Sequence, residues 1–187
     1  MQLPKPGRLI RRVHAGSYML AWGTIAPDAP TTIAVRSPDF AEGGAIPAIH
    51  AAEGEGDNVS PALEWSGVPE GTRQLLLIVE DPDVPLPRPV IHLIARLDPS
   101  RTGVGRGELN EEATDTGIVL HPGSFFRVGY AGPNPIRGHG PHRYVFQLFA
   151  LSKSLPLSVT AKREEIAAAS YGSILARGRT WGTFERP

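Results

Sequence analysis

Short blocks of hydrophobic residues, broken by turn-forming residues, dominate the pattern along the chain, and long helical periods are rare. The segments 74–80, 90–97 and 142–150 are each rich in Val, Ile, Leu or Phe, and Gly, Pro, Asp or Ser stands close to their ends. Such segments are typical of β-strands. The pattern therefore predicts a mainly β protein.

Each side of a strand takes every second residue, so the two faces of each segment can be compared. In the first segment the apolar face leads directly to Asp81. In the third, His142 and Tyr144 share one side while Arg143 faces away. The second segment has an expected core face and an opposite face that carries His92. The core face consists of Ile91, Leu93, Ala95 and Leu97, and the opposite face of Val90, His92, Ile94 and Arg96.

The remaining pattern favours a β-sandwich with one C-terminal α-helix. The 21 Gly and 19 Pro residues are spread along the chain and imply many turns. A helix is expected over Ala161–Ala176, with Thr160 as its N-cap and Gly178 at its end. Residues 179–186 are then expected to form the last strand.

The alternation that opens the domain begins at residues 32–36, so residues 31–187 are interpreted as one β-sandwich domain. A chain of 187 residues is consistent with a single buried core. Residues 1–30 are interpreted as an N-terminal extension with little periodicity of its own. The extension could cover a sheet edge or a second copy of the chain, which leaves a homodimer open.

Charge and composition exclude several functional classes. Lys plus Arg and Asp plus Glu number 19 each, so no net field favours nucleic acid or an acidic membrane, and any bound anion must be held locally. The absence of Cys excludes disulfides, thiolate metal sites and a Cys nucleophile. The first 30 residues match a secretion signal poorly and no segment has the length of a membrane span, so a cytoplasmic location is expected.

Several ordered blocks resemble the phosphatidylethanolamine-binding proteins, and more closely their bacterial, YbhB/YbcL-like branch. The blocks are SPDFAEGGAIPA from Ser37, DNVSPALEW from Asp57, VEDPDVP from Val79, the strand with His92, and YAGPNPIRGHGPHRYVFQLFAL from Tyr130. With the helix and the final strand the resemblance spans roughly residues 32 to 186. DPD together with GPHRY is its most specific part.

The resemblance implies a mainly β sandwich of two antiparallel sheets with a C-terminal α-helix and short peripheral helices. It also implies a small pocket at one end for phosphate-like or carboxylate anions. The implied ligands are phosphate, acetate or a phosphorylated head group, and no cofactor or metal is expected. The implied pocket residues are Asp81, His92, His142 and Tyr144, with Gly132 and Pro133 in a loop that forms another wall. A Gly there would let a backbone amide approach the anion closely.

The chemistry of these residue types fits an anion site without reference to the family. A histidine near its usual pKa of about 6.5 becomes a two-donor cation at small cost. Asp81 would accept one imidazole N–H so that the other points into the pocket, and Tyr144 would add a hydroxyl donor. Affinity for phosphate or acetate is then expected to weaken from about pH 5.5 to 8 as the histidines lose protons.

Four residues near the expected pocket are expected to have structural roles: Asp83, Arg88, Pro89 and Arg143. Arg143 is expected to pair with Asp83 on the opposite face. Pro89 follows Arg88 where the family tends to have an unusual cis peptide bond, and proline lowers the cost of that bond to about 0.5–1 kcal/mol. A cis bond between Arg88 and Pro89 is therefore expected.

Three other functions stay open at this point. A metal-dependent hydrolase could use Asp81, Asp83, His92 and His142, although the usual His-Glu-x-x-His pattern is absent. A serine hydrolase is disfavoured because the chain has no Gly-x-Ser-x-Gly sequence. A regulatory module that binds or inhibits a partner kinase or protease is the strongest alternative. The preferred interpretation is a non-catalytic, regulatory binding protein.

Overall fold

The structure is a computed structural model that describes residues 6–110 and 117–187. The described residues form two antiparallel sheets, as expected for the β-sandwich fold. The larger sheet has the order β6-β4-β3-β7-β8, with β3 (Gln74–Asp81), β4 (Val90–Leu97), β6 (Ile118–His121), β7 (His142–Leu151) and β8 (Ile174–Phe184). The smaller has the order β1-β2-β5, with β1 (Ala34–Arg36), β2 (Leu63–Ser66) and β5 (Gly103–Val104).

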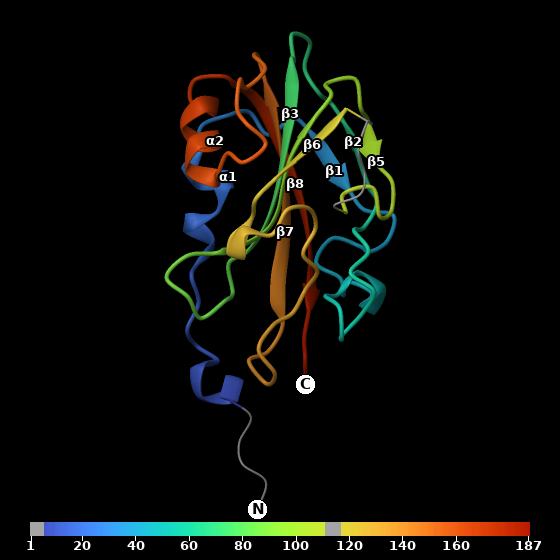
Figure 1. Cartoon of the computed structure of the whole chain (residues 1–187), viewed down its shortest axis with the longest axis vertical. Coiled ribbons are helices and arrows are strands. Elements are labelled where there is room, and N and C mark those ends of the chain that lie inside the picture. Colours follow the sequence, from blue (N-terminus) through green and yellow to red (C-terminus); the bar gives the residue numbers. More distant parts are fainter. Residues whose placement is uncertain (1–5, 111–116) are drawn as a thin grey trace, which may run out of the picture.

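Short helices occupy the periphery. The α-helices are α1 (Ala21–Thr24) and α2 (Arg163–Ser170), and the 3-10 helices are η1 (Pro6–Ile10), η2 (Ser17–Met19), η3 (Ala48–His50) and η4 (Ser124–Phe126). Figure 1 shows α1 and α2 on one side of the larger sheet and the smaller sheet on the other. The larger sheet is therefore covered on both faces.

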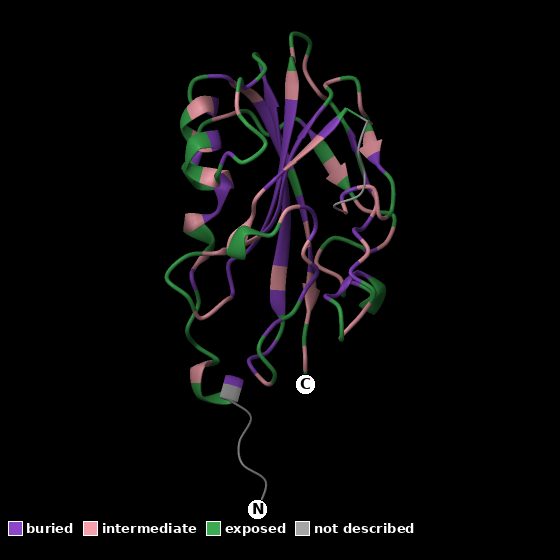
Figure 2. Cartoon of the chain, viewed as in Figure 1, coloured by how far each residue is buried: buried purple, intermediate pink, exposed green. Residues whose placement is uncertain are grey.

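This double covering explains why β3 is apolar on both of its sides. Leu77 and the residues of β3 on the same face pack between the two sheets, together with Trp65 and Phe146. Ile78 faces the other way and packs in a second cluster with Ile166 of α2. A central strand with two buried faces has a continuous hydrophobic run instead of an alternating one. Figure 2 shows the central strands buried over most of their length.

The C-terminal helix is shorter than the sequence suggests. It spans Arg163–Ser170 instead of Ala161–Ala176, and Lys162, not Thr160, is its N-cap. The backbone N–H of Lys162 donates to the Glu165 carboxylate at 2.9 Å, which is half of a capping box. Gly172, with φ +69°, turns the chain out of the helix.

The residues expected at the end of the helix belong to β8 because the chain there finds a partner strand. Ala176 pairs with Ala150 of β7, and the strand continues to Phe184, so the last strand is Ile174–Phe184 instead of 179–186. Gly178 lies inside this strand and does not end the helix. A Cβ at Gly178 would come within 2.1 Å of the carbonyl oxygen of Ile33, the residue just before β1. The close approach of these two backbones therefore requires Gly at position 178.

A β-bulge shifts the register between β3 and β4. Val79 pairs with Leu93, but the next residue, Glu80, pairs with Ile91, so His92 is the extra residue on β4. The bulge reverses the expected side of Ile91, which packs in the outer cluster and not on the core face with Leu93. A strict period-two alternation from the sequence was wrong here because it cannot include an inserted residue.

Residues of the N-terminal segment lie against the outer face of the larger sheet. The Ala21 N–H donates to the buried Glu80 carboxylate at 2.6 Å, and the Trp22 N–H donates to the Gln147 side chain at 2.6 Å. The Arg163 guanidinium of α2 also contacts Glu80, at 3.0 Å. These contacts hold α1 and α2 against the outer face of the larger sheet.

Candidate functional site

Three strands bring the four expected polar side chains to one cavity. Asp81 ends β3, His92 lies near the start of β4, and His142 and Tyr144 begin β7. All four line a cavity of about 560 Å³. His92 is 8% exposed and Tyr144 is 1% exposed, so the polar residues lie at a recessed end of the cavity.

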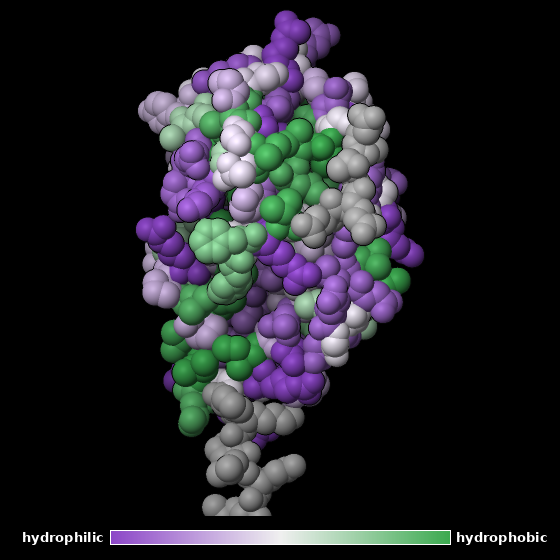
Figure 3. Space-filling view, viewed as in Figure 1, coloured by the Kyte–Doolittle hydropathy of each residue, from purple (hydrophilic) through white to green (hydrophobic). Residues whose placement is uncertain are grey.

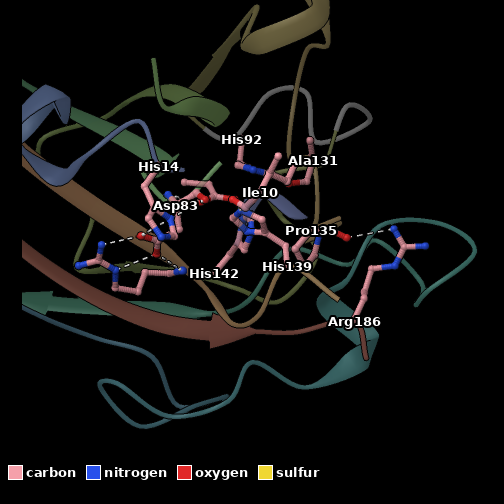
Figure 4. Close-up of polar contacts among 11 residues, drawn as sticks. Ile10, His14, Asp83, His92, Ala131, Pro135, His139, His142 and Arg186 are labelled. Carbon is pink, nitrogen blue, oxygen red and sulfur yellow. Dashed lines mark hydrogen bonds and ion pairs between the residues drawn. The ribbon is translucent and has the colours of Figure 1, made fainter. Parts of the chain in front are cut away.

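A chain of three hydrogen bonds leads from the cavity to the N-terminal segment (Figure 4). Asp81 Oδ2 lies 2.7 Å from His142 Nδ1, and His142 Nε2 lies 2.7 Å from His139 Nδ1. His139 Nε2 in turn donates to the Ile10 carbonyl at 2.9 Å. Sequence reasoning missed His139, although it stands three residues before His142 in the sequence GHGPH.

These bonds leave no free N–H on His142. Its Nε2 faces His139, so the expectation that Asp81 would direct an N–H of His142 into the pocket is wrong. Both oxygens of Asp81 are also engaged, because Oδ1 accepts the Asp83 backbone N–H at 2.8 Å. Asp81 and His142 therefore form the floor of the cavity, and the hydrogen-bonding groups of both side chains are already paired with other protein groups.

His92 presents a hydrogen-bond acceptor to the cavity at neutral pH. Its Nδ1 lies 2.6 Å from the Ala131 carbonyl, which can only accept, so Nδ1 carries the proton (Figure 4). Burial lowers the pKa of His92 below 6.5 and outweighs the opposite effect of Asp81. The neutral ring then offers the lone pair of Nε2.

The hydroxyl of Tyr144 is the unsatisfied group of the site. It is buried without a hydrogen-bond partner of acceptable geometry, although the Asp81 carboxylate and the Asn134 backbone are its polar neighbours. Burial, and then the charge of Asp81, raise the pKa of Tyr144, so the phenol stays protonated. A buried donor without a partner costs about 1–3 kcal/mol, which a guest with an acceptor atom would recover.

Gly132 lines the cavity, but its amide does not approach a guest. The Gly132 N–H donates to the Asn58 side chain at 2.7 Å. A Cβ at Gly132 would come within 2.4 Å of the His50 carbonyl oxygen, so Gly is needed there for packing. Pro133 is not among the lining residues, and its carbonyl accepts the Ala52 N–H at 3.0 Å.

Asp83 and Arg143 lie beside the cavity and not in it. The guanidinium of Arg143 donates to both Asp83 oxygens, at 2.6 and 2.8 Å. Burial tends to raise the pKa of Asp83, but its bonds to Arg143 outweigh this effect and lower it. Because Asp83 is held in this way, the four-residue metal site of the hydrolase alternative does not assemble. Residues 6–110 and 117–187 contain no group of three or more acidic or His side chains placed to hold a metal ion.

Arg88 and Pro89 are not among the residues that line the cavity. Arg88 is exposed and its guanidinium is 3.5 Å from Glu164 of α2. The expected cis bond before Pro89 is wrong, since the described chain contains no cis peptide bond.

Most of the remaining cavity wall is apolar. It is formed largely by the loop after β3, the start of β4 and two further loops: Val84, Pro85, Leu86, Val90, Ile91, Phe125, Pro135 and Ile136. Phe125 is 81% exposed and has φ 59°, an uncommon value for an aromatic residue. Arg127 also lines the cavity and adds a cation. Figure 3 shows that apolar surface on this face of the molecule forms separate patches with polar surface between them.

Known proteins are similar to this chain in sequence and in fold. The family model of phosphatidylethanolamine-binding protein matches residues 36–185. The UPF0098 protein of Aquifex aeolicus is 38% identical over 153 residues, which are 81% of this chain and 88% of that protein. The crystal structure of Escherichia coli YbcL has a TM-score of 0.78 and 27% identity, covering 84% of this chain and 100% of YbcL.

A second solved structure, the homologue CT736 from Chlamydia trachomatis, has a TM-score of 0.74 and 29% identity, covering 84% of this chain and 99% of that chain. Among the described residues, no helix has both the length and the apolar character needed to cross a membrane. The family match over most of the chain and the shared fold lead to one conclusion: this chain belongs to the phosphatidylethanolamine-binding protein family.

Proposed function

We propose that this protein binds a small organic anion, without catalysis, in the cavity between β3, β4 and β7. A phosphate or carboxylate group of the ligand accepts a hydrogen bond from Tyr144, and from His92 when that ring is protonated, and an apolar part of the ligand lies along the wall near Leu86 and Phe125. The observation that carries the proposal is the buried, unpaired hydroxyl of Tyr144 at the closed end of the cavity.

The charges around the cavity support a guest with one acceptor group at its polar end. Tyr144 is a permanent neutral donor, and His92 becomes a second donor when it takes up a proton. Arg127 adds positive charge. Asp81 is already paired with His142 at 2.7 Å, which reduces its repulsion of an anion.

The size of the cavity supports a ligand larger than inorganic phosphate. Sites for small organic molecules span about 300–1,000 Å³, and this cavity of about 560 Å³ falls within that range. Its apolar wall would remain in contact with water if only phosphate or acetate were bound. An apolar group attached to the anion removes that surface from water and adds about 25 cal/mol per Å².

No catalytic step is assigned to the pocket. Asp81 and His142, the residues best suited to proton transfer, are engaged with other protein groups at 2.7–2.8 Å. A bound phosphate ester is therefore expected to remain intact. Release of phenol from phenyl phosphate by the purified protein would contradict this part of the proposal.

Calorimetry with three probes tests the proposal: phenyl phosphate, inorganic phosphate and the neutral benzyl alcohol. Phenyl phosphate is expected to bind about tenfold or more tightly than inorganic phosphate, and benzyl alcohol more weakly than both. NMR shifts on addition of phenyl phosphate should be largest at His92 and Tyr144. Equal binding of benzyl alcohol would overturn the anion assignment, and shifts confined to other surfaces would overturn the site.

A further inference from the structure

The N-terminal strap, which we define as residues 7–16, joins the two loops behind the pocket. At one end the Gly7 N–H donates to the Arg137 carbonyl at 3.2 Å. At the other end the Ala15 N–H donates to the Val84 carbonyl and the Gly16 N–H to the Pro82 carbonyl, both at 2.9 Å. The strap thus bridges the loop that follows β3 and the loop that precedes β7.

The strap lies too close to the second loop for any residue but Gly at position 7. A Cβ there would be 2.4 Å from the His139 backbone nitrogen and 2.5 Å from the Arg137 carbonyl oxygen. Both neighbours are backbone atoms and cannot move aside easily. This contact places the Ile10 carbonyl against His139, which is 2% exposed.

The three contacts from Asp81 to Ile10 set how many protons the side chains of Asp81, His142 and His139, which we call the pocket base, need in order to complete all three as hydrogen bonds. Each bond holds one proton, so the bonds at 2.7, 2.7 and 2.9 Å require three. Asp81 with two neutral imidazoles would hold only two protons and carry one negative charge. With the third proton, which the bond to the Ile10 carbonyl retains because that oxygen can only accept, the net charge of the three side chains is zero.

We propose that the strap acts through His139, as a positioning residue, to keep the pocket base neutral and so permit an anionic guest. The inference rests on the proposed function for the charge of that guest. If the strap is released, the bond to Ile10 is lost and two protons satisfy the remaining bonds. One uncompensated negative charge then lies at the closed end of the cavity and repels an anion.

Other groups around these three bonds do not replace the strap. Asp83 is held by Arg143, and His92 is bonded to Ala131. The ring of His14, from the strap itself, lies edge-on to His139 with centroids 5.4 Å apart. Within residues 6–110 and 117–187, the titratable or charged groups that face the pocket base are His14, Asp83, His92, Arg143 and Tyr144, with Arg11 beside Gly140.

Two substitutions at His139 separate the proton count from mere packing. In His139→Asn the side-chain oxygen can take the place of His139 Nδ1 as the acceptor for His142 Nε2, so a protonated Nε2 keeps its partner without Ile10. In His139→Ala that acceptor is lost. With phenyl phosphate at pH 7.5 we expect His139→Ala to bind at least tenfold more weakly than the wild type and His139→Asn within about threefold. Equal loss in both variants would overturn the inference.

A substitution in the strap tests its role without changing a residue that lines the cavity. Gly7→Ala should displace the strap and weaken phenyl phosphate binding at least tenfold. Gly23→Ala is the matched control, because its Cβ would meet nothing closer than the Tyr18 carbonyl oxygen at 3.4 Å. Combined with His139→Asn, Gly7→Ala should cause no further loss. A full additional loss in the double variant would contradict the proton mechanism.

NMR of the histidine ring nitrogens separates this inference from the proposed function. His142 Nε2 should carry a proton in the wild type and in His139→Asn, and should lose it in His139→Ala. If the wild type binds no phenyl phosphate, the proposed function fails while these nitrogen signals still decide the proton count. If Gly7→Ala does not fold, the pair at His139 decides the inference. An unprotonated Nε2 in the wild type would overturn it.

Discussion

The ring of His92 lies edge-on against the ring of Tyr144, with the two centroids 5.0 Å apart. This contact joins the extra residue of the β4 bulge to the start of β7. It places a neutral acceptor and a neutral donor side by side at the closed end of the cavity. The Tyr144 hydroxyl can donate to an ionised acid group of a ligand, and the neutral His92 ring can accept from a protonated one. Binding should therefore depend on both of these residues and on pH.

Replacing Tyr144 by Phe should weaken ligand binding without loss of stability. The Tyr144 hydroxyl makes no well-formed hydrogen bond in the free protein, so its removal should cost little stability. A hydrogen bond to a charged group contributes about 1.5–3 kcal/mol, so Tyr144→Phe should bind phenyl phosphate at least tenfold more weakly. Calorimetry measures the affinity and urea unfolding the stability. Unchanged affinity would show that the hydroxyl does not contact the ligand.

The affinity for a carboxylate should increase below pH 6.5 and be nearly constant between pH 7 and 8. Burial lowers the pKa of His92 below 6.5, so the ring becomes a cationic donor only in more acidic solution. Phenylacetate is a suitable probe because its charge is constant from pH 5.5 to 8. His92→Asn retains a donor toward Ala131 but does not titrate, and it should abolish the increase. A persistent increase in that variant would assign the effect to another group.

His121 should make the fold less stable in acid. Burial and the neighbouring Arg96 lower the pKa of His121 from 6.5 to about 4. The unfolded chain therefore binds a proton below pH 6.5 that the folded chain excludes until about pH 4, so stability is lost as the pH falls through this window. The loss should approach about 3 kcal/mol.

The matched variant for this prediction is His121→Gln. Its side-chain oxygen can still accept from Arg96 Nε, which lies 2.7 Å from His121 Nε2 in the wild type. Urea unfolding at pH 7 and pH 4.5 should show a smaller difference in the free energy of unfolding for His121→Gln. An identical difference in both proteins would mean that His121 does not contribute.

Replacing Arg143 by Ala should reduce stability and leave ligand affinity unchanged. The substitution would leave the largely buried Asp83 without its two guanidinium bonds. The cost should be about 2 kcal/mol, below that of a fully buried pair because Arg143 is partly exposed. Arg88→Ala is the control, since its exposed contact with Glu164 should contribute less than about 1 kcal/mol. A selective loss of phenyl phosphate affinity in Arg143→Ala would instead place Arg143 in the site.

The sequence was sufficient for features that depend on local periodicity. Residues 74–80, 90–97 and 142–150 are strands, and Asp81, His142 and Tyr144 share a side because alternation along β3 and β7 is regular. The length of the helix was wrong because the pairing of Ala176 with Ala150, far away in the sequence, overrides local helix propensity.

Features that depend on contacts distant in the sequence could not be predicted in this way. The bulge at His92 depends on the register between two strands, and nothing in the segment 90–97 marks an inserted residue. His139 bonds to the backbone carbonyl of Ile10, which lies 129 residues away in the sequence. The amide of Gly132 is likewise occupied by Asn58, 74 residues earlier.

The inserted residue on β4 divides that strand into two parts that can be changed independently. Leu93, which follows the inserted residue, packs in the interior of the sandwich. Val90 and Ile91, which precede it, line the cavity. An engineer could therefore vary positions 90 and 91 to accept a differently shaped guest and leave the packing between the two sheets intact. Deleting one residue at the bulge would make the alternation of side chains continuous along β4. Positions 90 and 91 could then no longer be changed independently of the core.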